Sequence, residues 1–236
     1  MTDGQDLASD PRGRNVVAPA WHTLALLSVL AALTILGWLG QRNARMHPTS
    51  ATSHPHLVPL QIEAMIFEWA TLVWVWFGIR LKCIRVRDLV GGRWPGVRSI
   101  LVDIMLAGVL WLTWIGITRA VNLLLGHPSD TIPFPGNLLE GFLAIIVAIS
   151  AGICEEIVFR GYLQRQFRAL TGSVGLAVVL QAGVFGMPHV YQGARTAAMA
   201  SLYGLLFGVL ALWRRSLRPG ILAHAWTDIA ARLLRF

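Results

Sequence analysis

Long apolar runs separated by short polar segments make up most of this chain of 236 residues. The first run, residues 21–40, reaches the length of roughly 20 residues that crosses a bilayer as a helix. Further runs follow at residues 60–79, 100–118, 137–154, 173–191, 196–213 and 217–234. Apolar positions continue at helical spacing through residues 155–170, so the fourth helix is predicted to extend over them. The pattern predicts an all-α, polytopic membrane helix bundle with seven or eight transmembrane helices.

The composition supports a membrane protein. Hydrophobic residues make up 55% of the chain and charged residues only 14%, whereas about 25% is charged in an average soluble domain. The net charge of +8 comes from basic residues that cluster between the apolar runs. Such clusters are typical of membrane topology and not of a nucleic-acid surface. We therefore expect the lipid bilayer as a partner and no nucleic acid.

The basic clusters also predict the orientation. Residues 80–99 hold six basic residues and one acidic residue, whereas residues 120–136 hold no Lys or Arg. By the positive-inside rule the first loop is cytoplasmic, which places the N-terminus in the cytoplasm as well. We predict three parts: a polar N-terminal tail at residues 1–18, N-terminal membrane helices at residues 19–136 and a C-terminal membrane region at residues 137–236.

Charge at the end of the fourth run is the first sign of chemistry. Glu155, Glu156 and Arg160 follow the apolar residues directly, and charge at membrane depth is costly and usually functional. The two glutamates point about 100° apart on a helix, so they cannot serve one site equally. Glu156 and Arg160 are four residues apart and can form an ion pair. This pairing leaves Glu155 as the candidate general base.

Two later segments add histidines. His189 follows Pro188, at a predicted break in the fifth helix, and His224 lies one helical turn before Asp228. A single histidine near a helix end is usually an interfacial residue, and His22 fits that interpretation.

Together with Glu155, the two histidines leave two mechanisms open. Glu155, His189 and His224 could hold a zinc ion with an activated water, although the His-Glu-x-x-His helix of zinc proteases is absent. Alternatively, Glu155 deprotonates water directly while the other side chains assist.

Three motifs occur in order on successive apolar runs: Glu155-Glu156-x-x-x-Arg160, Phe185-x-x-x-His189 and His224-x-x-x-Asp228. They resemble the motifs of the CPBP family, the CAAX-protease and bacteriocin-processing-like intramembrane endopeptidases related to type II CAAX prenyl proteases. The resemblance covers roughly residues 137–236. It implies that these residues form a catalytic core and that the protein lies in the inner (plasma) membrane of a bacterium.

The resemblance implies an intramembrane endopeptidase that hydrolyses a peptide bond of a membrane-associated protein or peptide without a cofactor. It implies that Glu155 activates water with the help of His189. His224 and the residue at position 228 would stabilise the oxyanion, while Glu156 and Arg160 support the site. The family often has Asn at the last position. Asp228 accepts hydrogen bonds but does not donate them when ionised, which favours orientation of His224 as its role.

A shared site requires a particular geometry. If the fourth helix ended near Glu155, His189 would lie about 25 Å away, 17 residues into the fifth helix. We therefore predict a long, tilted fourth helix that continues to Leu170.

Two other functions compete with proteolysis. One is a non-catalytic membrane immunity or scaffold protein of the same fold. The other is an ion-coupled transporter, for which Glu63, Glu68 and Asp103 supply further intramembrane carboxylates. A transporter predicts paired or repeated broken helices, and the sequence contains no such repeat.

Overall fold

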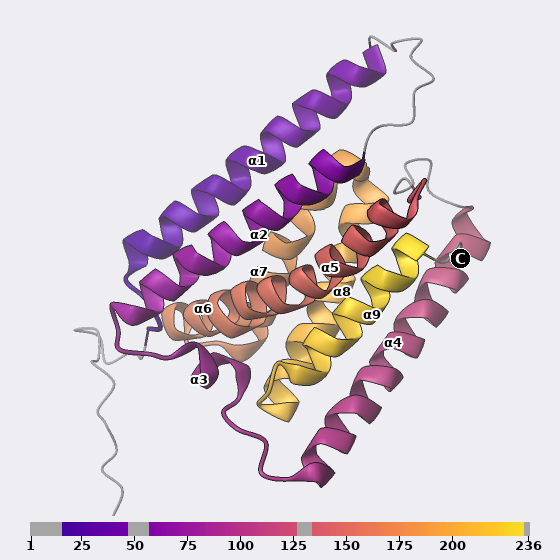
Figure 1. Ribbon diagram of the computed structural model, residues 1–236. Helices are drawn as coiled ribbons and strands as arrows, with labels where there is room; N and C mark the ends of the chain where they lie inside the picture. Colours follow the sequence, from indigo (N-terminus) through magenta and orange to yellow (C-terminus); the bar gives the residue numbers. More distant parts are fainter. Residues whose placement is uncertain (1–15, 47–56, 127–133, 234–236) are drawn as a thin grey trace, which may run out of the picture.

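The computed structural model describes residues 16–46, 57–126 and 134–233, and all regular secondary structure within them is helical (Figure 1). Most of the predicted polar tail, residues 1–15, lies outside the described residues. The helices of the first half are α1 (Ala20–Met46), α2 (Leu57–Arg80), α3 (Val86–Val90) and α4 (Val97–Leu125). Those of the second half are α5 (Leu138–Glu155), η1 (Glu156–Leu163), α6 (Gln164–Thr171), α7 (Val174–Gly186), η2 (Met187–Gln192), α8 (Ala194–Arg214) and α9 (Arg218–Leu233).

Six helical segments of the described residues are long and apolar enough to cross a membrane. They are Ala20–Asn43, Leu57–Arg80, Val97–Leu125, Leu138–Thr171, Val174–Gln192 and Ala194–Arg214. The seventh predicted run forms α9, which has 16 residues. The prediction of an all-α membrane bundle is confirmed, and the chain is an integral membrane protein.

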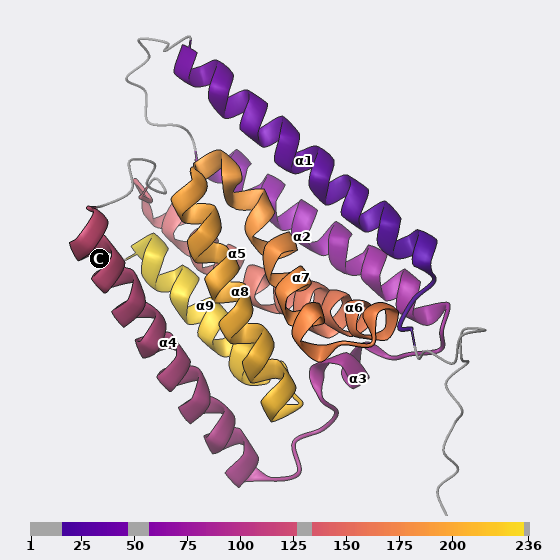
Figure 2. The same cartoon turned by 180° about the vertical axis from the view of Figure 1, so that it is seen from behind.

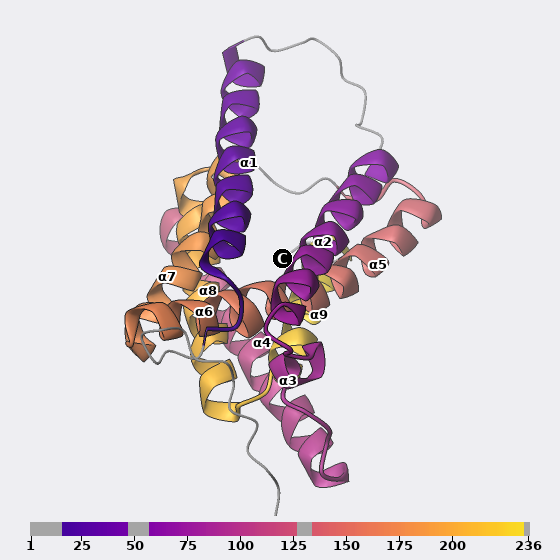
Figure 3. The same cartoon turned by 90° about the vertical axis from the view of Figure 1, so that its left-hand side faces the viewer.

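The segment Leu138–Thr171 lies at the centre of the bundle. It is 61% buried, against 11–33% for the five other spans. Its first part, α5, packs against α2 on one side and α9 on the other, and α4 covers the far side of α9 (Figure 1). Its last part, α6, packs against α7, which pairs with α8 on the opposite face of the molecule (Figure 2). Figure 3 shows α1 and α2 diverging from their closely placed lower ends.

The central segment continues as predicted, from α5 through η1 and α6 to Thr171. Because the segment continues, Glu155 and His189 lie at similar distances from the turn between α6 and α7. Glu155 lies 16 residues before Thr171, and His189 lies 15 residues after Val174 at the start of the returning helix. At 1.5 Å per residue both are about 23 Å from the turn. A short fourth helix would have kept them apart, whereas this helical hairpin places them opposite each other.

Glycines allow the central helices to approach closely. A Cβ atom at Gly152 would lie 2.9 Å from the Ile221 carbonyl oxygen and 3.0 Å from the Ala225 nitrogen, so the backbones of α5 and α9 are in contact there. A Cβ atom at Gly204 would lie 2.9 Å from Ala182 Cα, which brings α8 equally close to α7. The Gly-x-x-x-Gly pair that begins at Gly204 thus packs helices within this chain.

Buried polar contacts attach the start of α1 to the central helix. The side-chain oxygen of Gln166 accepts hydrogen bonds from the backbone nitrogens of Val17 (2.9 Å) and Ala18 (3.2 Å). His22 is fully buried, with Nδ1 2.8 Å from the Tyr162 hydroxyl and Nε2 2.8 Å from the Trp74 carbonyl oxygen. The interpretation of His22 as an ordinary interfacial histidine is therefore wrong, because three helices enclose it.

Candidate active site

The paired glutamates lie where the central helix changes its winding. Residues Glu156–Leu163 form a π-helix, with Glu155 as the last residue of α5. A π-helical segment widens the helix and is frequent at functional sites. All eight of its residues are buried. Glu156 and Arg160 of the first motif therefore lie inside the protein and are shielded from lipid.

Glu156 connects the first motif to the third. Its Oε1 lies 3.0 Å from Arg160 Nη1 and 3.0 Å from His224 Nδ1, and the three side chains are 0–5% exposed. The carboxylate can only accept, so Nδ1 of His224 carries the proton of this hydrogen bond. The predicted pairing of Glu156 with Arg160 is present. Its extension to His224 shows that Glu156 is the residue that orients this ring.

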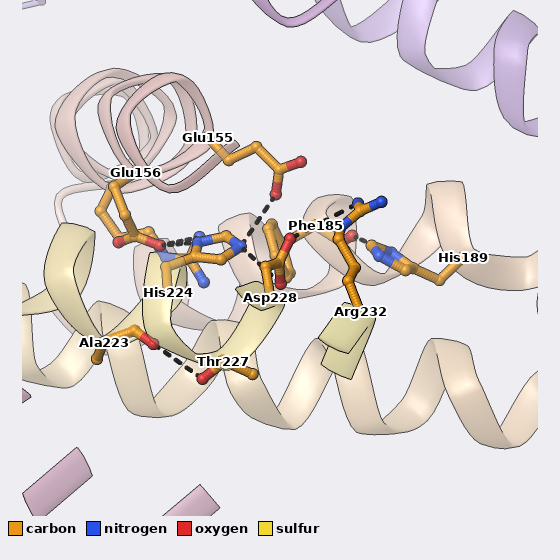
Figure 4. Close-up of polar contacts among 10 residues, drawn as sticks. Glu155, Glu156, Phe185, His189, Ala223, His224, Thr227, Asp228 and Arg232 are labelled. Atoms are coloured by element: carbon orange, nitrogen blue, oxygen red, sulfur yellow. Dashed lines mark hydrogen bonds and ion pairs between the residues drawn. The ribbon is translucent and has the colours of Figure 1, made fainter. Parts of the chain in front are cut away.

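Glu155 approaches the same ring from its other edge. Its Oε2 lies 3.6 Å from His224 Nε2, and its side chain is 31% exposed (Figure 4). We expected that the adjacent glutamates cannot serve one site equally, and they contact different nitrogens of the ring at different distances. Because the ring has two nitrogens on different edges, two diverging carboxylates can each face one of them.

Asp228 lies further from the ring than expected. Its Oδ1 is 4.0 Å from His224 Nε2, beyond hydrogen-bond distance, and its Oδ2 is 3.9 Å from Arg232 Nη2. The hydrogen bond that orients His224 comes from Glu156 and not from Asp228. Arg232 is a neighbour of the site that the sequence motifs did not include.

In the second motif, Phe185 contacts both His189 and Arg160. The Phe185 carbonyl oxygen accepts a hydrogen bond from His189 Nδ1 at 3.1 Å, which leaves Nε2 of the neutral ring unprotonated. The Phe185 ring lies under Arg160, with the guanidinium carbon 4.3 Å from the ring centroid. One residue thus fixes the tautomer of His189 and supports the arginine of the first motif.

Glu155 and His189 line one cavity of about 80 Å³, together with apolar residues of α1, α2, η1 and α7. This volume holds two or three water molecules at about 30 Å³ each. Within the described residues no hydrogen bond or ion pair joins the two side chains. Both side chains therefore border one small space that a water molecule can enter.

Glu68 of α2 is a third acidic side chain at this cavity. Its Oε2 is buried and has no hydrogen-bond partner within the described part of the chain. The sequence marks Glu68 only as an intramembrane carboxylate, because nothing in its spacing connects α2 with the three motifs. Only the packing of α2 against α5 brings it there.

The zinc alternative requires Glu155, His189 and His224 to converge. Across residues 16–46, 57–126 and 134–233, no group of three or more His, Cys, Asp or Glu side chains is arranged to hold a metal ion. The hydrogen bond from His224 Nδ1 to Glu156 leaves Nε2 as the nitrogen of this ring that could bind a metal ion. No step below depends on a metal ion.

The sequence was compared with known protein families, curated proteins and solved structures. Residues 137–230 match the model of the family described as type II CAAX prenyl endopeptidase Rce1-like. Comparisons with curated proteins and with solved structures gave no match. The matched segment begins at the N-cap of α5 and ends within α9, so it includes all three motifs. The resemblance to the CPBP and CAAX-protease family is thereby confirmed over residues 137–230, a segment that is similar to the Rce1-like type II CAAX prenyl endopeptidases, a family of membrane-embedded proteases.

Proposed function

We propose that this protein is an intramembrane endopeptidase that cleaves a peptide bond of a membrane-associated protein or peptide with water activated by Glu155. The observation that carries the proposal is the position of Glu155. Its carboxylate faces His224 on one side and lines a water-sized cavity with His189 on the other. Residues 137–236 form the catalytic core in this proposal, and residues 19–136 supply supporting helices and part of the cavity wall.

The proposed reaction begins with a water molecule in the cavity. Glu155 takes a proton from this water, and the water oxygen attacks the carbonyl carbon of the peptide bond. His189 accepts a hydrogen bond from the same water through its unprotonated Nε2. The carbonyl oxygen becomes an oxyanion, which His224 stabilises by donating Nε2–H when its ring is doubly protonated. Glu155 then gives its proton to the leaving nitrogen, and the C–N bond breaks.

Glu156 and Arg160 act as positioning residues in this scheme. Glu156 fixes Nδ1–H of His224, so the ring presents only Nε2 to the substrate. Arg160 balances the charge of Glu156, which would otherwise be buried without a counter-ion. Asp228 and Arg232 extend the charged site along α9.

The proposed location is the inner membrane of a bacterium, with the N-terminus in the cytoplasm. The start of α1, the turn between α6 and α7 and the turn between α8 and α9 lie at one end of the bundle, with α3 (Figure 1). The basic residues of positions 80–99 lie at this end, which supports its assignment to the cytoplasm.

A comparison of membrane proteomes tests the proposal. Cells producing the intact protein, Glu155→Gln or Glu63→Gln are compared for polypeptides that remain uncleaved. Glu63 is the matched control, because it is an exposed glutamate of α2 away from the cavity. We expect at least one membrane polypeptide to accumulate uncleaved with Glu155→Gln and to be processed normally with Glu63→Gln. Identical proteomes at equal protein levels would contradict proteolysis.

A further inference from the structure

A second cavity, separate from the water-sized one, lies between α6 and the turn from α8 into α9. Its volume is about 390 Å³, within the range of small-ligand sites. Four arginines line the cavity: Arg160, Arg165, Arg168 and Arg215. The other lining residues are Gln164, Ser216 and three apolar residues. No acidic side chain lines it in the part of the chain that the structure describes. A cavity with this lining has a strongly positive potential.

The arginines are incompletely neutralised. Within residues 16–46, 57–126 and 134–233, the side chains of Arg168 and Arg215 form no ion pair or hydrogen bond. Arg165 donates to two neutral acceptors, the carbonyl oxygens of Asp88 (2.9 Å) and Leu89 (2.8 Å). The Asp88 carboxylate also acts on Arg165, but it lies 3.7 Å from Arg87, with which it shares its charge.

The buried lining residues also have unused hydrogen-bonding atoms. Arg160 is 1% exposed, and its one ion pair among the described residues is with Glu156. None of its three guanidinium nitrogens makes a hydrogen bond of good geometry to the described residues. Unpaired buried donors are rare in proteins and indicate a missing partner. An anion in the cavity would provide one.

The location of the cavity indicates which anion reaches it. Ser216 donates to the Val90 carbonyl oxygen at 3.3 Å, and Leu217 donates to the same oxygen at 3.0 Å. The cavity therefore lies beside the basic segment of residues 80–99, at the end of the bundle where α3 is drawn (Figure 1). Basic pockets between transmembrane helices at this level bind the headgroups of anionic phospholipids.

We propose that this cavity binds a phosphate group, supplied by the headgroup of an anionic phospholipid such as phosphatidylglycerol. The chemistry is that of arginine with phosphate, in which planar guanidinium groups donate paired hydrogen bonds. The site is independent of peptide cleavage, but Arg160 belongs to both regions. Anion binding therefore takes place next to the pair that positions His224.

Lipid binding by the purified full-length protein tests the proposal. The protein is placed in vesicles of phosphatidylcholine alone or of phosphatidylcholine mixed with phosphatidylglycerol, and thermal unfolding is followed. Native mass spectrometry counts the phosphatidylglycerol molecules that remain bound after extraction. The variant Arg168→Gln/Arg215→Gln removes the two unpaired arginines. The control Arg85→Gln/Arg93→Gln removes two exposed arginines of the nearby basic segment, residues 80–99. It lowers the net charge by the same amount.

We expect phosphatidylglycerol to stabilise the intact protein and the control. The site variant should bind it about 25-fold more weakly, at about fivefold for each arginine. Equal loss in both variants would show a general charge effect and overturn the proposal, as would unchanged binding in the site variant. Inorganic phosphate added to phosphatidylcholine vesicles distinguishes the source. If phosphate stabilises the intact protein but not the site variant, while phosphatidylglycerol stabilises neither, the anion site is supported with a soluble ligand and the lipid headgroup is rejected.

Discussion

The ion pair of Glu156 with Arg160 allows a quantitative prediction about the buried site. We consider Glu156→Gln, Arg160→Met and the variant that combines them. Gln keeps the shape of the side chain and an oxygen that can accept from His224, but it removes the negative charge. Met keeps much of the apolar stem of the arginine and removes the positive charge. Each single variant leaves one buried charge without its partner, whereas the combined variant removes both.

The magnitude follows from the distance and the burial. At 3.0 Å and an effective dielectric constant of about 20, the attraction between the two charges is about 5–6 kcal/mol. Much of this offsets the cost of removing the charges from water, and the loss of one buried partner usually costs about 3–5 kcal/mol. In Glu156→Gln the rings of Phe185 and Phe207, 4.3 and 5.5 Å from the guanidinium carbon, retain about 1–2 kcal/mol of interaction with Arg160.

We therefore expect Glu156→Gln and Arg160→Met each to lower the free energy of unfolding by about 3 kcal/mol. The combined variant should lose less than the two together, with a coupling of about 2 kcal/mol. Equilibrium unfolding in mixed detergent micelles measures the three differences. All three variants should lose peptide cleavage, because His224 loses its charged partner or the support of that partner. Additive losses of stability, or single variants as stable as the intact protein, would refute the assignment of a mutually neutralised buried pair.

Three further changes test other parts of the structure. In Gly152→Val the new Cβ atom would lie only 2.9–3.0 Å from backbone atoms of α9. We therefore expect α5 and α9 to separate, which lowers the unfolding temperature and abolishes cleavage. His22→Phe should destabilise the protein by about 1–3 kcal/mol in the same unfolding assay, because the Tyr162 hydroxyl loses a buried partner. Glu68→Gln should reduce cleavage of peptides with Lys beside the scissile bond by about tenfold relative to uncharged peptides, since a carboxylate at the cavity attracts a cation.

Each of these changes has a matched control, which lies on the same helix for His22 and Glu68 and on α7 for Gly152. Gly183→Val should leave the unfolding temperature nearly unchanged, because nothing lies within 4 Å of a Cβ atom there. Trp21→Phe alters an exposed neighbour of His22, with 54% of its surface accessible, and should change stability little. Glu63→Gln should retain the preference for Lys-containing peptides. A control that behaves like its partner variant would show that the contact named above is not the cause.

The apolar runs predicted the spans well because helix length in a bilayer is fixed by its thickness. The predicted start at residue 137 matches a helix whose N-cap is Asn137, with its side-chain oxygen 3.0 Å from the Glu140 nitrogen. The break at Pro188 also follows from local chemistry, since α7 ends at Gly186 and a 3₁₀-helix follows. These features depend on neighbours in the sequence.

Contacts between helices that are far apart in the sequence could not be predicted from it. The helical periodicity of α2 gives no indication that Glu68 faces the cavity, and a histidine near the start of α1 looks the same whether lipid or Trp74 covers it. Spacing on α9 suggested Asp228 as the partner of His224. The carboxylate closest to the ring comes from another helix, because Gly152 lets α5 lie directly against α9. The assignment of roles to the motif residues stays a prediction until cleavage is measured.

In the proposed mechanism the two glutamates have different roles, because they face different nitrogens of the His224 ring. Glu156 accepts Nδ1–H of His224 at 3.0 Å and is held by Arg160, so the proton on that side has no other acceptor. Nε2 faces Glu155 at 3.6 Å, about 0.5 Å longer than a hydrogen bond, and a small movement or a water molecule closes this gap. Proton exchange is therefore confined to the Nε2 edge, where the substrate carbonyl would lie. A carboxylate at position 155 alone could accept a proton from water but could not direct the donor of His224 to the oxyanion. The adjacent pair therefore allows one helix to supply the base and also to fix the direction of the acid that faces it.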